Sequence, residues 1–193
     1  MTIYGWLICA VWLVLVAYWG LMGARVRRST GRPWIWWREI AVRLGFFALV
    51  LLALEVVAAA RRALPNMPLY AFNTSWLLGG IGFLLCAPGV ALVIWSRSCL
   101  GRAGDVTVSR KQTPELVTTG PYAFVRHPIY SGMLLAMLGS AIGQSIFWLF
   151  PLVVYGPGFI LSARREERLL IEHFPERYRA YMTRTRMLLP FLL

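Results

Sequence analysis

Three long apolar stretches constrain this chain more than any other feature of its sequence. They cover residues 3–22, 40–60 and 75–95. A helix needs about 20 apolar residues to cross the roughly 30 Å hydrocarbon core of a bilayer, so each stretch predicts one membrane-spanning helix. The composition agrees, because 59% hydrophobic and only 15% charged residues is too apolar for an ordinary soluble domain.

A fourth apolar region, residues 128–161, is too long for a single span. Gly143, Gln144 and Ser145 interrupt it, which predicts two short helices joined as a hairpin. The sequence therefore predicts an all-α integral membrane protein with five transmembrane helices, of which the last two form the hairpin.

The charged segment that follows the hairpin predicts a cytoplasmic amphipathic helix. Proline cannot continue a helical hydrogen-bond ladder but fits a first turn, so Pro175 should break or restart this helix. Large apolar residues recur there at roughly helical spacing, namely Leu169, Leu170, Phe174, Tyr178 and Tyr181.

The net charge of +12 could indicate a nucleic-acid partner, but the basic residues follow the membrane topology instead. All but Arg61 and Arg62 of the 20 lysines and arginines fall on one predicted side. The positive-inside rule then places both large loops and the C-terminus in the cytoplasm and the N-terminus outside. We expect a multi-pass protein of a bacterial inner membrane with no nucleic-acid partner. The three cysteines show no metal-binding spacing, so no metal is expected.

Polar residues able to carry chemistry gather at the cytoplasmic ends of the predicted hairpin. His127 and Tyr130 are three residues apart at the start of the fourth span. Glu166 and Glu167 lie where the fifth span leaves the membrane. Because the two helices form a hairpin, these ends should be neighbours, which predicts a polar pocket partly within the membrane.

Each of these residues also has a purely structural interpretation. Arg126 and His127 could reach from the helix end to the interface, and the glutamates could pair with nearby arginines. Gly139 and Gly143 form a GxxxG spacing that favours close helix packing and needs no functional role.

The sequence "ELVTTGPYAFVRHPIY", followed by a hairpin and "EERLLIEHFPERYRAYMTRTRMLLP", resembles the isoprenylcysteine carboxyl methyltransferase family and, more loosely, the phospholipid N-methyltransferases. The shared pattern is RHPxY, then a glutamate pair, then an FxxxYxxY-like tail. The resemblance implies an integral membrane methyltransferase that binds S-adenosylmethionine on its cytoplasmic side. It also predicts two regions: a three-helix transmembrane region, residues 1–95, and a unit of cofactor-binding loop, hairpin and C-terminal helix, residues 96–193.

The resemblance assigns expected roles to individual residues. Arg126 or His127 would face the donor's carboxylate and Glu166 its ammonium or ribose, while Tyr122 or Tyr130 would contact adenine or the sulfonium. The expected catalytic residues are Arg126, His127 and Glu167. The expected cofactor-binding residues are Pro114, Glu115, Leu116, Val117, Tyr122, His127, Pro128, Ile129, Tyr130 and Glu166.

The resemblance further implies a lipid or lipidated acceptor embedded in the membrane, with membrane lipids as neighbours. We expect isoprenylcysteine-type carboxyl O-methylation first and phospholipid or small-amine N-methylation as the alternative. Ser162 stands where the family carries a substrate-facing arginine, although Arg164 or Arg165 could replace that cation. The alternative functions from other classes of protein are a transporter and a non-catalytic membrane scaffold.

Overall fold

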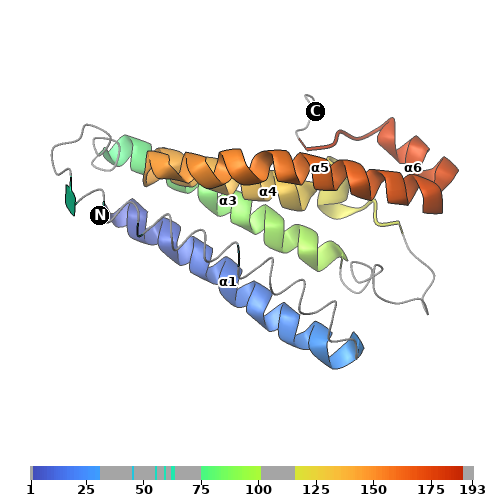
Figure 1. Ribbon diagram of the computed structural model, residues 1–193, viewed down its shortest axis with the longest axis horizontal. Helices are drawn as coiled ribbons and strands as arrows, with labels where there is room; N and C mark the ends of the chain where they lie inside the picture. Colours follow the sequence, from blue (N-terminus) through green and yellow to red (C-terminus); the bar gives the residue numbers. More distant parts are fainter. Residues whose placement is uncertain are drawn as a thin grey trace. The chain divides into compact units, whose positions relative to one another are not determined.

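The computed structural model of the chain describes residues 2–30, 45, 55, 59, 62–63, 75–100 and 116–188. No β-strand occurs in these ranges, and the prediction of an all-α fold is confirmed for this part of the chain. Two short 3₁₀ helices, η3 (Gly120–Ala123) and η4 (Ile146–Trp148), connect longer elements. The α-helices are α1 (Ile3–Thr30), α3 (Trp76–Leu100), α4 (Pro128–Gly143), α5 (Leu149–His173) and α6 (Pro175–Met182), shown in Figure 1.

Among the described residues, three helical stretches are long and apolar enough to cross a membrane: Ile3–Met22, Trp76–Leu100 and Ile146–His173. The shorter apolar helix α4 ends at Gly143, so the predicted interruption between the two hairpin helices is confirmed. The predicted second span, residues 40–60, lies outside the described residues except for isolated positions. The count of five spans therefore stays a prediction, whereas a membrane protein is established.

Prolines set the starts of two helices. Pro128 opens α4 and Pro175 opens α6, where a missing N–H costs no helical hydrogen bond. The break predicted at Pro175 is confirmed. Helix α5 continues well beyond the apolar region to His173 because the residues after Ser162 are strong helix formers with no glycine or proline among them. The charged residues between Ser162 and His173 thus extend α5, and only the residues from Pro175 onward form a separate helix, α6.

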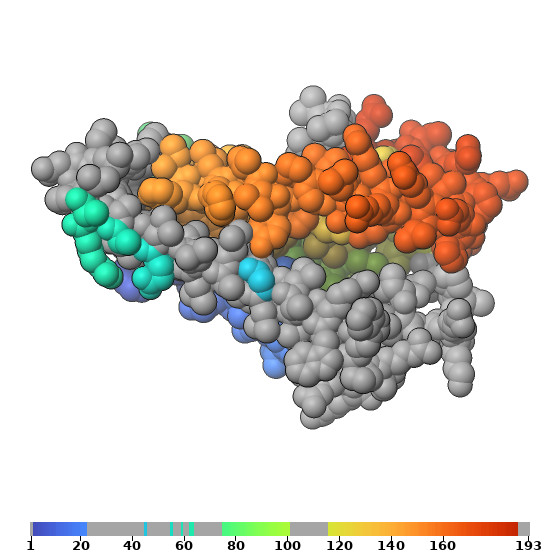
Figure 2. Space-filling view, viewed as in Figure 1, coloured from blue at the N-terminus to red at the C-terminus, as the bar shows by residue number. Residues whose placement is uncertain are grey.

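Large apolar side chains lie exposed along α5, and Figure 2 shows this helix at the surface over much of its length. Val153 is 69% exposed and Phe150 is 55% exposed. Such an apolar surface is unfavourable in water and is expected where side chains face lipid.

The chain divides into two compact units. The first comprises Met1–Ala87 and Met137–Val153, and the second comprises Pro88–Ala136 and Val154–Leu193. The boundary predicted between residues 95 and 96 falls within α3.

Glycines allow α3 and α4 to approach closely within the first unit. A Cβ atom on Gly82 would lie 2.3 Å from the Cα of Gly143, and one on Gly139 would lie 2.5 Å from the backbone nitrogen of Cys86. No larger residue fits at this distance, so the packing role predicted for Gly139 and Gly143 is confirmed.

Buried polar groups in the first unit satisfy one another. Trp12 Nε1 donates to Ser140 Oγ at 3.0 Å, and Trp148 Nε1 donates to Gln144 Oε1 at 2.7 Å. The Trp12 and Trp148 rings stack with their centroids 5.0 Å apart. Hydrogen bonds of this kind hold helices together where lipid offers no polar partner.

The second unit repeats the close glycine packing and carries the polar end of the hairpin. A Cβ atom on Gly132 of α4 would lie 2.5 Å from the carbonyl oxygen of Gly89 on α3. The start of α4, the C-terminal half of α5 and all of α6 belong to this unit, which contains the candidate site.

Candidate active site

The segment that leads into α4 starts at Gly120, a glycine with positive φ. Gly120 has φ +62°, in the left-handed region that side chains disfavour, and a Cβ atom there would lie 2.8 Å from Cys99 Sγ. The 3₁₀ helix that starts at Gly120 turns the chain, and Val125 then pairs with Arg186 in an isolated parallel bridge. This geometry places Arg126 and His127 directly before the first turn of α4.

Arg126 and Glu167 form a buried ion pair. The Nε atom of Arg126 donates to Oε1 of Glu167 at 2.6 Å, and the two side chains are only 10% and 11% exposed. Arg126 Nη1 also donates to the carbonyl oxygen of Thr185 at 2.5 Å. A buried cation is tolerated only with such partners. The ion pair connects the residue before the start of α4 to α5.

His127 lies between the two glutamates of α5. Its Nε2 atom is 3.3 Å from Glu167 Oε1, and its Nδ1 atom is 3.4 Å from Glu166 Oε2. Burial alone would lower the pKa of this imidazole, but the hydrogen bonds and charges of the two carboxylates outweigh burial and raise the pKa above its ordinary value. The raised pKa favours the protonated imidazole, whose two N–H groups would each face one of the carboxylates.

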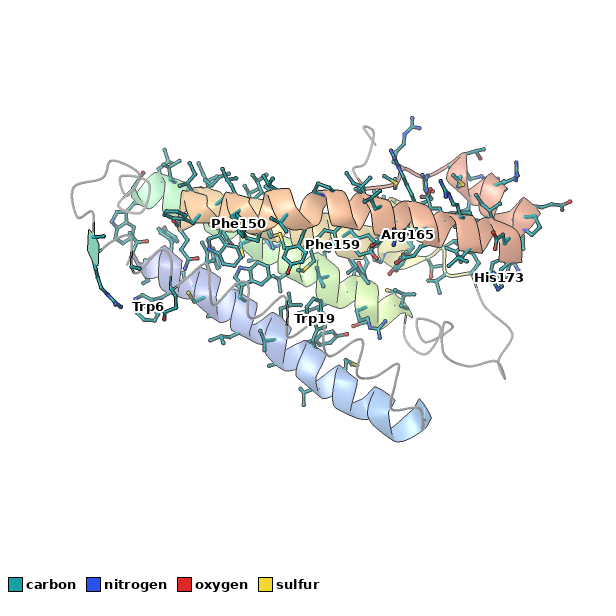
Figure 3. The ribbon with its side chains drawn as sticks, viewed as in Figure 1. Trp6, Trp19, Phe150, Phe159, Arg165 and His173 are labelled. Carbon is teal, nitrogen blue, oxygen red and sulfur yellow. The ribbon has the colours of Figure 1, made fainter. Side chains whose placement is uncertain are left out.

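Glu166 is the more open member of the glutamate pair. Its side chain is 50% exposed, while Oε1 accepts a hydrogen bond from the Tyr130 hydroxyl at 2.5 Å. Tyr130 stacks against His127 on one side, with ring centroids 5.6 Å apart, and against Phe159 on the other, at 5.1 Å. Figure 3 labels Phe159 and Arg165 on the stretch of α5 that carries this site. Glu166 is thus a carboxylate held by ring-edge groups of two stacked rings, those of His127 and Tyr130.

Three tyrosines from η3 and α6 lie near the polar cluster. The Tyr181 hydroxyl donates to the backbone oxygen of Tyr122 at 2.5 Å, and burial raises the pKa of Tyr181 to about 12. Burial also raises the pKa of Tyr122 and of Tyr178, whose side chain is only 1% exposed. All three hydroxyls stay protonated at neutral pH, and that of Tyr181 uses its proton in the bond to Tyr122.

The structure brings five of the twelve predicted site residues together. Arg126, His127, Tyr130, Glu166 and Glu167 form one connected network. Pro128 and Ile129 form the first turn of α4, and the half-buried Leu116 and Val117 have no regular secondary structure. Pro114 and Glu115 lie outside the described residues.

The contribution of the segment after α6 could not be anticipated from side chains. The carbonyl oxygen of Thr185 accepts from the Arg126 side chain. The carbonyl oxygens of Arg186 and Met187 accept from the backbone N–H groups of Arg126 and His127. Backbone acceptors leave no signature in residue type. The only sequence signal nearby was the FxxxYxxY-like tail, which contains Tyr178 and Tyr181.

The matched region of a known protein family covers this site. The model of the family described as phospholipid methyltransferase matches residues 78–177, which is more than half of the chain. The chain belongs to this phospholipid methyltransferase family. The match runs from α3 through α5 to the start of α6 and includes both glutamates together with the RHPxY motif.

Curated relatives of this family member include two named for an activity. Methanethiol S-methyltransferase 1 of Bradyrhizobium diazoefficiens is 38% identical over 87 residues, which cover 45% of this chain and 28% of that protein. Methanethiol S-methyltransferase of Pseudomonas deceptionensis is 35% identical over 74 residues, which cover 37% of this chain and 27% of that protein. The nickel-cobalt-cadmium resistance protein NccN of Alcaligenes xylosoxydans xylosoxydans is 32% identical over 87 residues, which cover 44% of this chain and 40% of that protein. Each match spans well under half of the relative's length.

Proposed function

We propose that this protein is an integral membrane methyltransferase that transfers a methyl group from S-adenosylmethionine to a lipid-soluble acceptor. Family membership supports the reaction class. The single observation that carries the proposal is the half-exposed Glu166 carboxylate, which His127 and Tyr130 fix at the polar end of an otherwise apolar helix. A fixed anion beside aromatic rings suits a cationic ligand.

The chemical groups of S-adenosylmethionine fit this part of the chain. Glu166 keeps half of its side-chain surface open for an ammonium group or a ribose diol. His127 and Phe159 cover the two faces of the Tyr130 ring, so adenine or the sulfonium would meet the hydroxyl-bearing edge of this ring beside Glu166. Residues 114–117, Tyr122 and the first turn of α4 remain the proposed further contacts.

Arg126 and His127 are better placed to hold the glutamates than to meet the ligand's carboxylate. Two nitrogen atoms of Arg126 already donate to Glu167 and to the Thr185 carbonyl. Both ring nitrogens of His127 face carboxylates. We therefore propose that Arg126, His127 and Glu167 position Glu166, and that a protonated His127 does not serve as a general base.

The bound cofactor would supply an activated methyl group, so the protein needs little covalent chemistry of its own. The chain's contribution is to orient the reactants and to exclude water. Buried Tyr122 and Tyr178 keep the polar cluster compact, while the exposed apolar surface of α5 faces lipid, from which an acceptor can approach.

A thiol is the acceptor that the relatives favour, because two of them are methanethiol S-methyltransferases. The half-buried Ser162 on α5 agrees with an acceptor other than a carboxylate, since it offers no cation for one. Isoprenylcysteine-type carboxyl O-methylation is the second candidate. It is favoured by the RHPxY and glutamate-pair motifs, and exposed Arg164 and Arg165 could supply the cation. Phospholipid or small-amine N-methylation is the third acceptor class.

The distribution of arginine supports a cytoplasmic site. All seven arginines between residues 164 and 186 are exposed in the region that follows the apolar part of α5. The positive-inside rule places such a region in the cytoplasm, where the water-soluble methyl donor is made available. We propose this orientation, in an inner membrane, together with an extracytoplasmic N-terminus.

Transfer of labelled methyl groups tests the proposal directly. Detergent-purified protein is supplied with methyl-labelled S-adenosylmethionine and, separately, a short-chain thiol, a farnesylated cysteine and phosphatidylethanolamine. We expect label on the thiol first. Label on the farnesylated cysteine or the phospholipid would change the acceptor and keep the reaction class. Absence of transfer together with absence of S-adenosylhomocysteine binding would contradict the reaction class itself.

A further inference from the structure

The chain after α6 turns back (Figure 1). It pairs there with the residues that precede α4. We call residues 183–188 the return segment. The backbone N–H of Arg126 donates to the Arg186 carbonyl at 2.8 Å, and that of His127 donates to the Met187 carbonyl at 3.0 Å. Val125 and Arg186 form the parallel bridge. The return segment therefore fixes the backbone of the two cationic site residues.

The return segment also holds side chains. Arg126 Nη1 donates to the Thr185 carbonyl, and the hydroxyl of Ser131 donates to the Leu188 carbonyl. Arg126 is thus bonded to Glu167 on α5 by one nitrogen and to the return segment by another. Loss of the segment would leave a buried guanidinium and two backbone N–H groups short of acceptors, which is costly in a poorly hydrated site.

Side chains near the start of the return segment anchor it to α6 and to η3. The Thr185 hydroxyl donates to the Tyr181 carbonyl at 2.8 Å. The Tyr181 hydroxyl in turn donates to the backbone oxygen of Tyr122. These two hydroxyls connect the return segment to the η3 turn that leads into Arg126. The hydroxyl of exposed Thr183 also bonds to α6, at the Ala180 carbonyl at 2.8 Å, but Ala180 carries no hydroxyl that could continue the connection to η3.

We propose that the return segment positions the site, with Tyr181 and Thr185 as positioning residues. The segment sets the place of Arg126 and His127, which hold the two glutamates, and thereby sets the orientation in which Glu166 meets the methyl donor. This inference rests on the proposed function. It extends that function to residues that lie beyond the family-matched region and make no contact with Glu166 in the described structure.

Two single-hydroxyl deletions and one matched control test the proposal. Tyr181→Phe removes the bond to Tyr122, Thr185→Val removes the bond to Tyr181, and Thr183→Val is the control on the same segment. Calorimetry with S-adenosylhomocysteine measures the dissociation constant and the bound fraction separately. Hydrogen exchange measures protection of the Arg126 and His127 amides in the absence of ligand.

We expect Tyr181→Phe and Thr185→Val to raise the dissociation constant at least fivefold and to speed exchange of both amides at least tenfold, without lowering the bound fraction. Thr183→Val should match wild type in all three. A variant that only unfolds part of the protein would lower the bound fraction and leave the dissociation constant unchanged, which would overturn the positioning role. Unchanged amide exchange in both variants would overturn it as well. If Tyr181→Phe does not fold, Thr185→Val alone decides.

The failure of this proposal is distinguishable from failure of the proposed function. Wild-type protein that binds no S-adenosylhomocysteine contradicts the function. Wild-type protein that binds the compound, with variants whose affinity is unchanged, contradicts only the positioning role of the return segment.

Discussion

Arg126 and Glu167 are 41 positions apart in the sequence, yet the Nε atom of Arg126 lies 2.6 Å from Oε1 of Glu167 in a largely buried contact. This pair joins the RHPxY motif to the glutamate pair. It also explains why an arginine and a histidine are placed at the entrance to an apolar helix. Arg126 offsets the charge of the buried Glu167 carboxylate, and His127 lies between this group and the half-exposed Glu166.

Arg126→Met should destabilise the protein by about 3–5 kcal/mol, because it leaves the Glu167 carboxylate buried without its main partner. The double variant Arg126→Met/Glu167→Gln should recover a substantial part of this loss. Unfolding in a mild detergent, compared across the two single variants and the double variant, measures the coupling free energy. Strictly additive losses would show that the two side chains do not stabilise each other.

The stability that His127 confers should fall as the pH rises. Its pKa is raised in the folded protein, so the favourable interaction of its charge with the glutamates is fully present below the unfolded-state pKa of about 6.5. That contribution is lost as the pH rises through the folded-state pKa. The difference in thermal midpoint between wild type and His127→Gln, measured from pH 6 to pH 10, should therefore shrink with increasing pH. A difference that grows with pH would contradict a protonated His127.

Close packing of α3 and α4 gives an independent prediction about the membrane helices. Gly139→Ala should destabilise the protein by about 1–3 kcal/mol, since the new Cβ would be 2.5 Å from the backbone of Cys86. Gly158→Ala on α5 is the matched control, because a Cβ there meets nothing within 4 Å. That control should be neutral or stabilising by up to about 1 kcal/mol, as alanine favours the helix. Equal effects at the two positions would argue against the observed packing.

The pH dependence of turnover should identify the chemical class of the acceptor. A thiol with a pKa near 8.5 becomes a better nucleophile as the pH rises, so its methylation rate should increase between about pH 6 and pH 9. A carboxylate acceptor is already ionised over this range and should give a flat profile. The measurement is initial rate at saturating methyl donor, with binding of S-adenosylhomocysteine checked at each pH. A flat profile would reject the thiol in favour of the carboxyl candidate.

Much of the fold follows from the sequence because apolar length and proline position are local signals. The span at residues 3–22, the break after Gly143 and the start of α6 at Pro175 were all predicted correctly. The end of α5 was not, since the expected boundary at the membrane surface does not interrupt a helix whose next residues also favour helix. The helix propensity of the residues after Ser162 continues α5 beyond its apolar part.

The meeting of His127 with Glu166 and Glu167 was predictable for a different reason. A hairpin must bring the two helix ends together, so topology alone placed the residues side by side. The contacts of Arg126 with Thr185 and of Tyr181 with Tyr122 were not predictable, because each uses a backbone carbonyl whose position depends on the whole unit. Side-chain identity carries no information about such acceptors.

We propose that Glu166 is the exposed carboxylate that receives the methyl donor. Calorimetry with S-adenosylhomocysteine on wild type, Glu166→Gln and Glu172→Gln tests it most directly, since Glu172 is exposed on the same helix. We predict binding by wild type and by Glu172→Gln, and a loss of at least tenfold in affinity for Glu166→Gln. Equal affinity in all three proteins, or no binding by wild type, would contradict the account.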